Sequence, residues 1–162
     1  LQIEGLEKLK TLCEQADSEI TVNREKKKAR YILGVCDTLS FNARHEFVRQ
    51  NEQALSNYFK SLRYKPDGDA LLILQAFVND NYISCYGFPI LDEVKESGRF
   101  NIIEIPECEQ ISAEMNWSET AADEMHQTLK LFLLENNLKV RYITEEVSTE
   151  TENKVIRISY CF

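Results

Sequence analysis

The sequence is poor both in the residues that break regular structure and in those that carry out much of enzyme chemistry. It contains 5 Gly, 3 Pro and 2 His among its 162 residues. So little Gly and Pro excludes collagen-like and low-complexity chains. Apolar residues make up 43% of the chain, which excludes intrinsic disorder and is enough for a sizeable core. The longest apolar run, residues 70–78, is broken by Gln75 and falls short of the ~20 residues of a membrane span, so no membrane contact is expected.

Recognisable catalytic motifs are also missing. The sequence has no Gly-rich phosphate loop, no GxSxG elbow and no HExxH pair. Two histidines leave little for a metal site; His126 follows Asp123 by three residues, and we interpret the two as a surface ion pair. We therefore expect no metal and no cofactor, and we favour a non-enzymatic protein while leaving enzymatic activity open.

The five cysteines show no CxxC pair and no regular spacing. Most stand in apolar surroundings, as Cys36 and Cys85 do, which is typical of small buried hydrophobic side chains. A secreted disulfide framework usually has an even number of cysteines, and residues 1–16 are charged and amphipathic, unlike a signal peptide. These features predict a reducing, cytoplasmic location.

Charge is unevenly distributed along the chain. The net charge is -8, and residues 66–162 hold 18 Asp and Glu against 7 Lys and Arg. This balance makes nucleic acid an unlikely partner and favours a basic protein, which an acidic face attracts at long range. The acidic residues that we expect to form this face are Glu104, Glu107, Glu109, Glu145, Glu146, Glu150 and Glu152. A single basic patch is expected on a helix and consists of Arg24, Lys26, Lys27, Lys28 and Arg30.

Helical spacing dominates the first third of the chain. Apolar residues at steps of three and four predict an amphipathic helix over residues 1–17, and its short heptad pattern leaves a homodimer through this helix as an alternative. A second helix is predicted over residues 23–39 and a third from about residue 40 to Leu62. Adjacent helices with short connections suggest a helical hairpin.

The periodicity changes after the turn at residues 65–69. Residues 71–78 and 82–88 predict a β-hairpin, Pro89 and Gly98 bracket a short helix, and residues 100–105 predict a third strand. Ser118 is the expected cap of a helix over residues 119–136, and residues 139–144 and 154–161 predict a closing hairpin whose tip spans 145–153. No internal sequence repeat is apparent.

The expected fold class is therefore α+β, in the order ααα-ββαβ-α-ββ. About three helices form an N-terminal helical hairpin, and a mostly antiparallel sheet of about five strands with two helices follows. We expect a mildly basic helical part over residues 1–65 and an acidic α/β part over residues 66–162, together in one compact domain. The chain begins with Leu, so a domain cut from a longer protein stays open.

His45 offers one further hypothesis. Its run His45-Glu46-Phe47 on a predicted helical hairpin loosely resembles the phosphoacceptor box of sensor histidine kinases and histidine phosphotransfer proteins. That resemblance implies a phosphate acceptor at His45 with Glu46 as its base. The Arg and Pro that usually follow the box are absent, and so are the ATP-binding boxes of a kinase.

Three functions follow from these patterns. The leading hypothesis is a protein-binding module, of the adaptor, chaperone-like or inhibitor type, that binds a basic partner through its acidic face. The alternatives are a phosphorelay or sensory signalling domain that works through His45, and a regulatory domain of a larger protein.

Overall fold

The computed structural model describes residues 21–148 and 154–162, and these form eight strands, two α-helices and one short 3-10 helix. The helix expected over residues 1–17 lies outside the described residues. The chain divides into two compact units. Unit 1 comprises Leu1–Lys27 and Cys108–Phe162, and unit 2 comprises Lys28–Glu107. The position expected for the boundary between the two parts, residues 65 and 66, falls inside unit 2.

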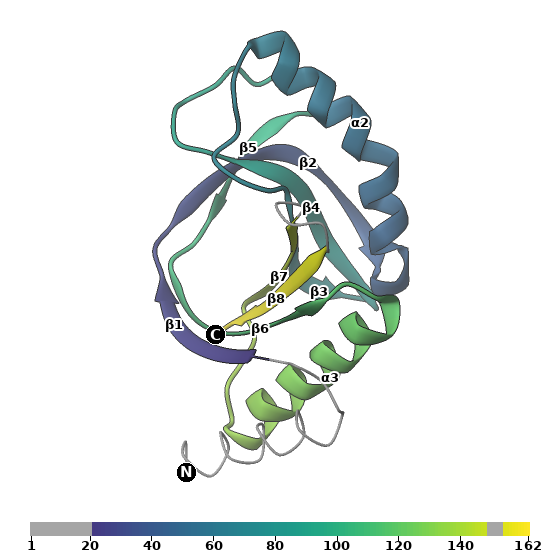
Figure 1. Ribbon diagram of the computed structural model, residues 1–162, viewed down its shortest axis with the longest axis vertical. Coiled ribbons are helices and arrows are strands. Elements are labelled where there is room, and N and C mark those ends of the chain that lie inside the picture. The colour runs from purple at the N-terminus through teal and green to yellow at the C-terminus, as the bar shows by residue number, and fades with distance from the viewer. Residues whose placement is uncertain (1–20, 149–153) are drawn as a thin grey trace. The chain divides into compact units, whose positions relative to one another are not determined.

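Unit 2 contains four strands and the first described α-helix. Its elements are β2 (Arg30–Ser40), η1 (Phe41–Ala43), α2 (Arg44–Leu62), β3 (Leu71–Val78), β4 (Asn81–Ile90) and β5 (Asn101–Ile105). The strands lie in the order β3-β4-β2-β5, and neighbouring strands are antiparallel. Helix α2 packs against β2 and β4 (Figure 1). Its inward side chains Leu55 and Phe59 are buried, and the Phe59 ring meets that of Phe88 edge-on at 5.2 Å.

Unit 1 also contains four strands and one described α-helix. Its elements are β1 (Thr21–Lys27), β6 (Cys108–Asn116), α3 (Glu119–Glu135), β7 (Tyr142–Ser148) and β8 (Val155–Cys161). The strands lie in the order β1-β6-β8-β7, again antiparallel. Helix α3 begins after Ser118, whose hydroxyl accepts a hydrogen bond from the Ala121 amide at 2.9 Å, as an N-cap should. It packs against β6 and β8 through a fully buried apolar stripe that includes Met125 and Leu129.

The two units repeat one topology. In each, a strand is followed by a helix and then by a hairpin, the second hairpin strand pairs with the first strand, and the helix packs on these two strands. A fourth strand, β5 in unit 2 and β1 in unit 1, completes the sheet beside the first strand. The sequence shows no matching repeat, because a shared topology constrains which positions are buried and not which residues fill them.

The expected fold class is wrong: the protein is mostly β, and no helical hairpin precedes the strands within residues 21–162. Residues predicted as a helix over 23–39 form β1 and β2. Four consecutive residues of β2, Ile32 to Val35, are buried. Such a run is typical of a strand covered on both faces. The helix predicted over residues 23–39 is wrong because a short apolar run does not distinguish a buried strand from a helix.

Two further elements differ from expectation. No helix follows Pro89, which lies in β4 opposite Ile32. The Pro89 carbonyl accepts a hydrogen bond from the Asp67 amide on the side of β4 that faces away from β2. Pairing of β4 with β3 has already ended at this position. The N–H that proline lacks is therefore not needed for a hydrogen bond between strands. Strand β6 was not expected at all, and β8, expected as an exposed terminal strand, lies between β6 and β7.

Candidate ligand-binding face

One face of the sheet in unit 1 is lined by polar side chains that are buried. Side chains alternate along a strand, so the residues that do not face α3 share the opposite side. Two rows cross β1, β6, β8 and β7 there; we call them the polar face, made of Glu25, Gln110, Cys161 and Tyr142 in one row and Asn23, Ser112, Ser159 and Thr144 in the next. The members from β6, β7 and β8 are all buried. Burial of so many polar groups is costly unless each finds a partner.

The first row is joined by hydrogen bonds. The Gln110 amide donates to Glu25 Oε1 at 3.1 Å, and Cys161 Sγ lies 3.8 Å from Gln110 Oε1 as a weak donor. The Tyr142 hydroxyl donates to Cys108 Sγ at 3.1 Å. Burial, followed by these contacts with Cys108 and Cys161, holds the pKa of Tyr142 well above its usual range. Tyr142 therefore keeps its proton and acts as a neutral donor.

Ser112, in the centre of the second row, has a hydroxyl without a hydrogen-bond partner in the described part of the chain. Its exposure is 0%. A buried, unpaired hydroxyl costs about 1–3 kcal/mol, and such groups in folded proteins call for an explanation such as a bound ligand or ion. Ser112 therefore marks the polar face as a candidate site for a molecule that offers a hydrogen-bond acceptor or donor.

A second polar cluster lies on the other side of the same sheet, against α3. His126 Nδ1 is 2.7 Å from the Tyr160 hydroxyl, and His126 Nε2 is 2.6 Å from Glu145 Oε2. All three side chains are buried, with exposures of 2% for His126, 1% for Tyr160 and 6% for Glu145. The expected surface ion pair at His126 is thus wrong, because the helix turns this histidine toward the sheet.

A hydroxyl, an imidazole and a carboxylate in sequence are the groups of a catalytic triad. Here the three buried groups join α3 to β7 and β8, and we assign them the role of holding the helix on the sheet.

The residues expected to form an acidic face are placed differently from one another. Glu145 is buried, and its neighbour Glu146 is half-buried on the opposite side of β7. Glu104 and Glu107 are exposed in unit 2. Glu109 is half-buried in unit 1, 3.6 Å from the Arg24 guanidinium. Glu150 and Glu152 lie outside the described residues.

The expected basic patch lies on strands and a turn, not on a helix. Arg24 and Lys26 belong to β1, Lys27 ends that strand 3.7 Å from Glu25, Lys28 follows it, and Arg30 begins β2. Arg24 also lies over the Phe162 ring, 5.2 Å from its centre. These contacts engage Arg24 and Lys27 in ion pairs within unit 1.

His45 lies in the first turn of α2 and is half-buried. Its expected base, Glu46, is 2.6 Å from the Arg49 guanidinium, and this hydrogen bond and charge hold the pKa of Glu46 below its usual range. Glu46 is therefore engaged with Arg49 on the helix surface. The phosphoacceptor role of His45 stays a hypothesis.

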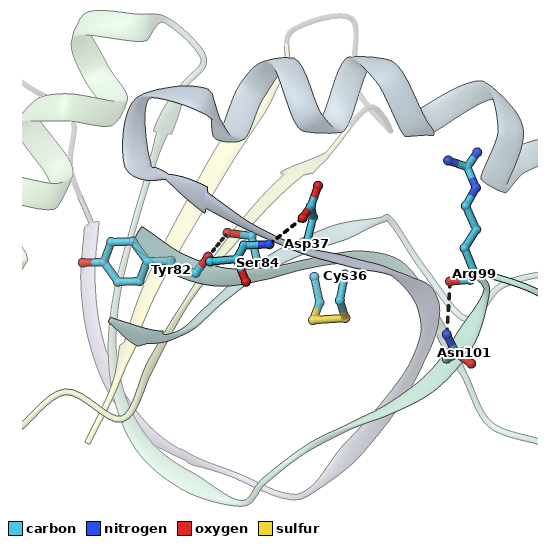
Figure 2. The surroundings of a disulfide bond; sticks show 8 residues. Cys36, Asp37, Tyr82, Ser84, Arg99 and Asn101 are labelled. Carbon is cyan, nitrogen blue, oxygen red and sulfur yellow. Dashed lines mark hydrogen bonds between the residues drawn. A yellow bond between two sulfur atoms is a disulfide. The ribbon is translucent and has the colours of Figure 1, made fainter. Parts of the chain in front are cut away.

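Two of the cysteines expected to be unpaired are joined. Cys36 of β2 and Cys85 of β4 face each other across the two strands and form a disulfide, which lies on the side of the sheet away from α2 (Figure 2). Cys108 and Cys161 are buried and form no disulfide within the described residues. The pairing of Cys36 with Cys85 could not be deduced from their separation of 49 residues.

Neither of the α-helices that the structure describes has the length and apolar character needed to cross a bilayer. Within residues 21–148 and 154–162, no three His, Cys, Asp or Glu side chains are grouped so as to hold a metal ion.

The polar face was missed by the sequence analysis, although a signal for it was present. Residues 110–115 alternate polar and apolar: Gln110 and Ser112 are each followed by an apolar residue, Ile111 and Ala113. This alternation predicts a strand. The burial of its polar side could not be predicted from the pattern alone, since alternation usually places the polar side in water.

No family model and no curated protein matches this sequence. Several solved structures share its fold. SAV2435 bound to tetraphenylphosphonium has a TM-score of 0.66 at 9% identity, over 87% of this chain and 93% of that one. EcmrR in a DNA complex has a TM-score of 0.68 at 9% identity, over 98% of this chain and 64% of that one. A hydrolase from Listeria innocua has a TM-score of 0.54 at 9% identity, over 92% of this chain and 96% of that one.

At such low identity these likenesses establish the fold alone. The fold is thus one found in a transcription regulator, in a protein bound to an organic cation and in a hydrolase. The presence of EcmrR in a DNA complex does not fit the expectation that nucleic acid is an unlikely partner.

Proposed function

We propose that this chain is a small-molecule-binding domain whose polar face takes a lipophilic organic cation that also carries a hydrogen-bond acceptor or donor. The observation that carries the proposal is the buried polar face of unit 1 with the unpaired hydroxyl of Ser112 at its centre. Small-molecule sites typically contain a few polar groups at fixed positions, and these groups orient the bound ligand. The fold shared with SAV2435, whose structure holds tetraphenylphosphonium, supports the ligand class.

Charge supports a cationic ligand. Unit 1 carries 16 Asp and Glu against 10 Lys and Arg, whereas unit 2 is closer to balance with 11 against 9. Glu25 lies at one end of the first row, and Glu146 follows in the next row beyond Thr144 on β7. A carboxylate within a few ångströms attracts a monovalent cation by about 1–4 kcal/mol near a protein surface. The neutral Tyr142 adds an aromatic ring without adding a charge.

The proposal is tested by titrating the full chain with tetraphenylphosphonium in a calorimeter. Triphenylphosphine oxide, a neutral molecule of similar shape with a hydrogen-bond acceptor, serves as the comparison ligand. We expect Glu25→Gln and Glu146→Gln each to weaken binding of the cation by roughly threefold to tenfold and to leave the neutral ligand unaffected. Glu104→Gln makes the same change at an exposed residue of unit 2 and should alter the affinity for neither the cation nor the neutral ligand.

The variant Ser112→Ala tests whether the hydroxyl contributes to ligand binding and not to the stability of the fold. Because the hydroxyl has no partner among the residues that the structure describes, its removal should not destabilise the protein. We expect the variant to bind the phosphine oxide less tightly and the cation as before. Absence of cation binding, or equal effects of Glu25→Gln and Glu104→Gln, would refute the proposal.

The hypothesis of an adaptor for a basic protein stays a prediction. Of the residues expected to form its acidic face, Glu104 and Glu107 are exposed, and they are the appropriate positions for Glu→Lys substitution. Salt-sensitive loss of a captured basic protein in these variants would support it.

A further inference from the structure

The disulfide of unit 2 is not used by the proposed ligand site, and one of its two cysteines is exposed to solvent. Cys36 is exposed, whereas Cys85 is 2% exposed. The Cα atoms are 4.1 Å apart, which is the short spacing of a non-hydrogen-bonded pair in an antiparallel ladder. Thiol–disulfide exchange requires that the attacking sulfur reach one of the two atoms, so the two halves of this bond are not equivalent.

The two rows of the sheet beside the disulfide differ in their exposure to solvent. On the face that carries the disulfide, the next row of the sheet holds Gly34 opposite Gly87, and neither has a side chain. The row on the other side holds Thr38 and Ile83, both exposed. The exposed row is therefore the side from which a small thiol can approach Cys36, whereas Gly34 and Gly87 on the other side are buried. Figure 2 shows the bond on the side of the sheet opposite α2 and Asp37 on the helix side.

The two glycines are required by the backbone. A Cβ on Gly34 would lie 2.1 Å from the Tyr86 carbonyl oxygen, and one on Gly87 would lie 2.5 Å from that of Leu33. Such contacts are far below van der Waals separation, so any other residue would push β2 and β4 apart. The same close approach of the strands thus keeps the row beside the disulfide free of side chains.

We infer that the Cys36–Cys85 disulfide is a reversible thiol-exchange site at which a small thiol of the glutathione class adds to Cys36. The thiolate of the small molecule attacks Cys36 Sγ, the bond between the two protein sulfurs breaks, and Cys85 leaves as a thiolate that takes a proton from water. A second small thiol then attacks the mixed disulfide and releases the oxidised small-molecule disulfide and a Cys36 thiol. Two thiols are oxidised and one protein disulfide is reduced.

The fold survives this exchange. Strands β2 and β4 are paired along ten residues, from Tyr31 opposite Ile90 to Ser40 opposite Asn81, so their ladder does not depend on the covalent bond. Cys108 and Cys161 are buried and are not expected to react in the folded chain. The site is therefore selective among the cysteines that the structure describes. The inference is independent of the proposed cation site, which lies in unit 1.

The test uses the full chain, purified without reductant. It is incubated with excess reduced glutathione, quenched with acid, alkylated and mapped by mass spectrometry of its peptides. We expect a mixed disulfide on Cys36, loss of the bond between Cys36 and Cys85, and circular dichroism that keeps the β signal. A bond that resists glutathione until urea unfolds the chain, an adduct found on Cys85, or a folded chain that never forms this bond would each overturn the inference.

Single-cysteine variants test the assignment of the two sulfurs. Cys85→Ser leaves the exposed thiol and Cys36→Ser leaves the buried one; oxidised glutathione should modify the first at least roughly tenfold faster, because its sulfur is accessible. Cys108→Ser is the matched control: it keeps Cys36 and Cys85 and should react with glutathione as the native chain does. Cys85→Ala and Cys36→Ala replace any serine variant that does not fold. Equal rates for the two thiols would contradict a site at Cys36.

Discussion

Removal of the His126 imidazole is the most informative single perturbation of unit 1. In His126→Leu, the carboxylate of Glu145 loses the ring nitrogen at 2.6 Å, and the Tyr160 hydroxyl loses the one at 2.7 Å. Both groups are buried, so water does not readily replace the ring. Each buried polar group left without its hydrogen-bond partner costs about 1–3 kcal/mol, and more when it is charged, so we expect a loss of about 3–5 kcal/mol for the two together. For a chain of this size each kcal/mol lowers the melting temperature by about 2–4 °C, so we expect a fall of roughly 6–20 °C.

The measurement is urea unfolding followed by the fluorescence of Trp117, which lies in unit 1 just before α3. Asp123→Asn, on the exposed side of the same helix, is the control and should change the unfolding free energy by less than about 0.5 kcal/mol. The double variant His126→Leu with Glu145→Leu should be less destabilised than the sum of its single changes, because the two groups interact directly. A His126→Leu protein within about 1 kcal/mol of the native stability would refute the assigned role of the cluster.

Three further changes probe other parts of the structure. Burial, with the charge of Glu52 adding to it, raises the pKa of Tyr86 from 10.0 to about 12, so its contribution to stability is complete below pH 10 and is lost as pH rises through 12. Tyr86→Phe should lack this alkaline loss in unfolding curves measured across that range; an unchanged alkaline profile would contradict it. Gly34→Ala should destabilise unit 2 by about 1–3 kcal/mol or more in urea unfolding, since its Cβ meets the backbone, and a stability gain would count against the strand geometry. Ser118→Ala should cost ~1 kcal/mol, with recovery in Ser118→Asp, because the hydroxyl caps the Ala121 amide; equal stability of the two variants would argue against the cap.

Local signals predicted several elements well. The helix from Arg44 to Leu62 and the helix after Ser118 are present close to the expected bounds, and so is the hairpin of β3 and β4. Each carries its signal in neighbouring residues: an apolar stripe, a capping serine, or a turn at Asn79 and Asp80, both of which have positive φ.

The candidate site was only partly predictable. Glu146 was expected to bind a partner, and it lies on β7 in the row next to Thr144. Gln110, Ser112 and Tyr142 were not identified, because a polar side chain in a strand normally faces water. Glu145 was assigned to the tip of the closing hairpin and to an acidic face, although it lies in β7 and is buried against His126.

The amino-acid sequence by itself determined the composition, the concentration of negative charge in the second part of the chain, and the helices and turns whose signals are local. Tertiary structure alone decided that residues 23–39 form strands, because Ile32 to Val35 are all buried only when both faces of β2 are covered. It also decided that Cys36 meets Cys85 and that His126 meets Glu145. These contacts join residues far apart in the chain, and no local pattern specifies which strands will become neighbours.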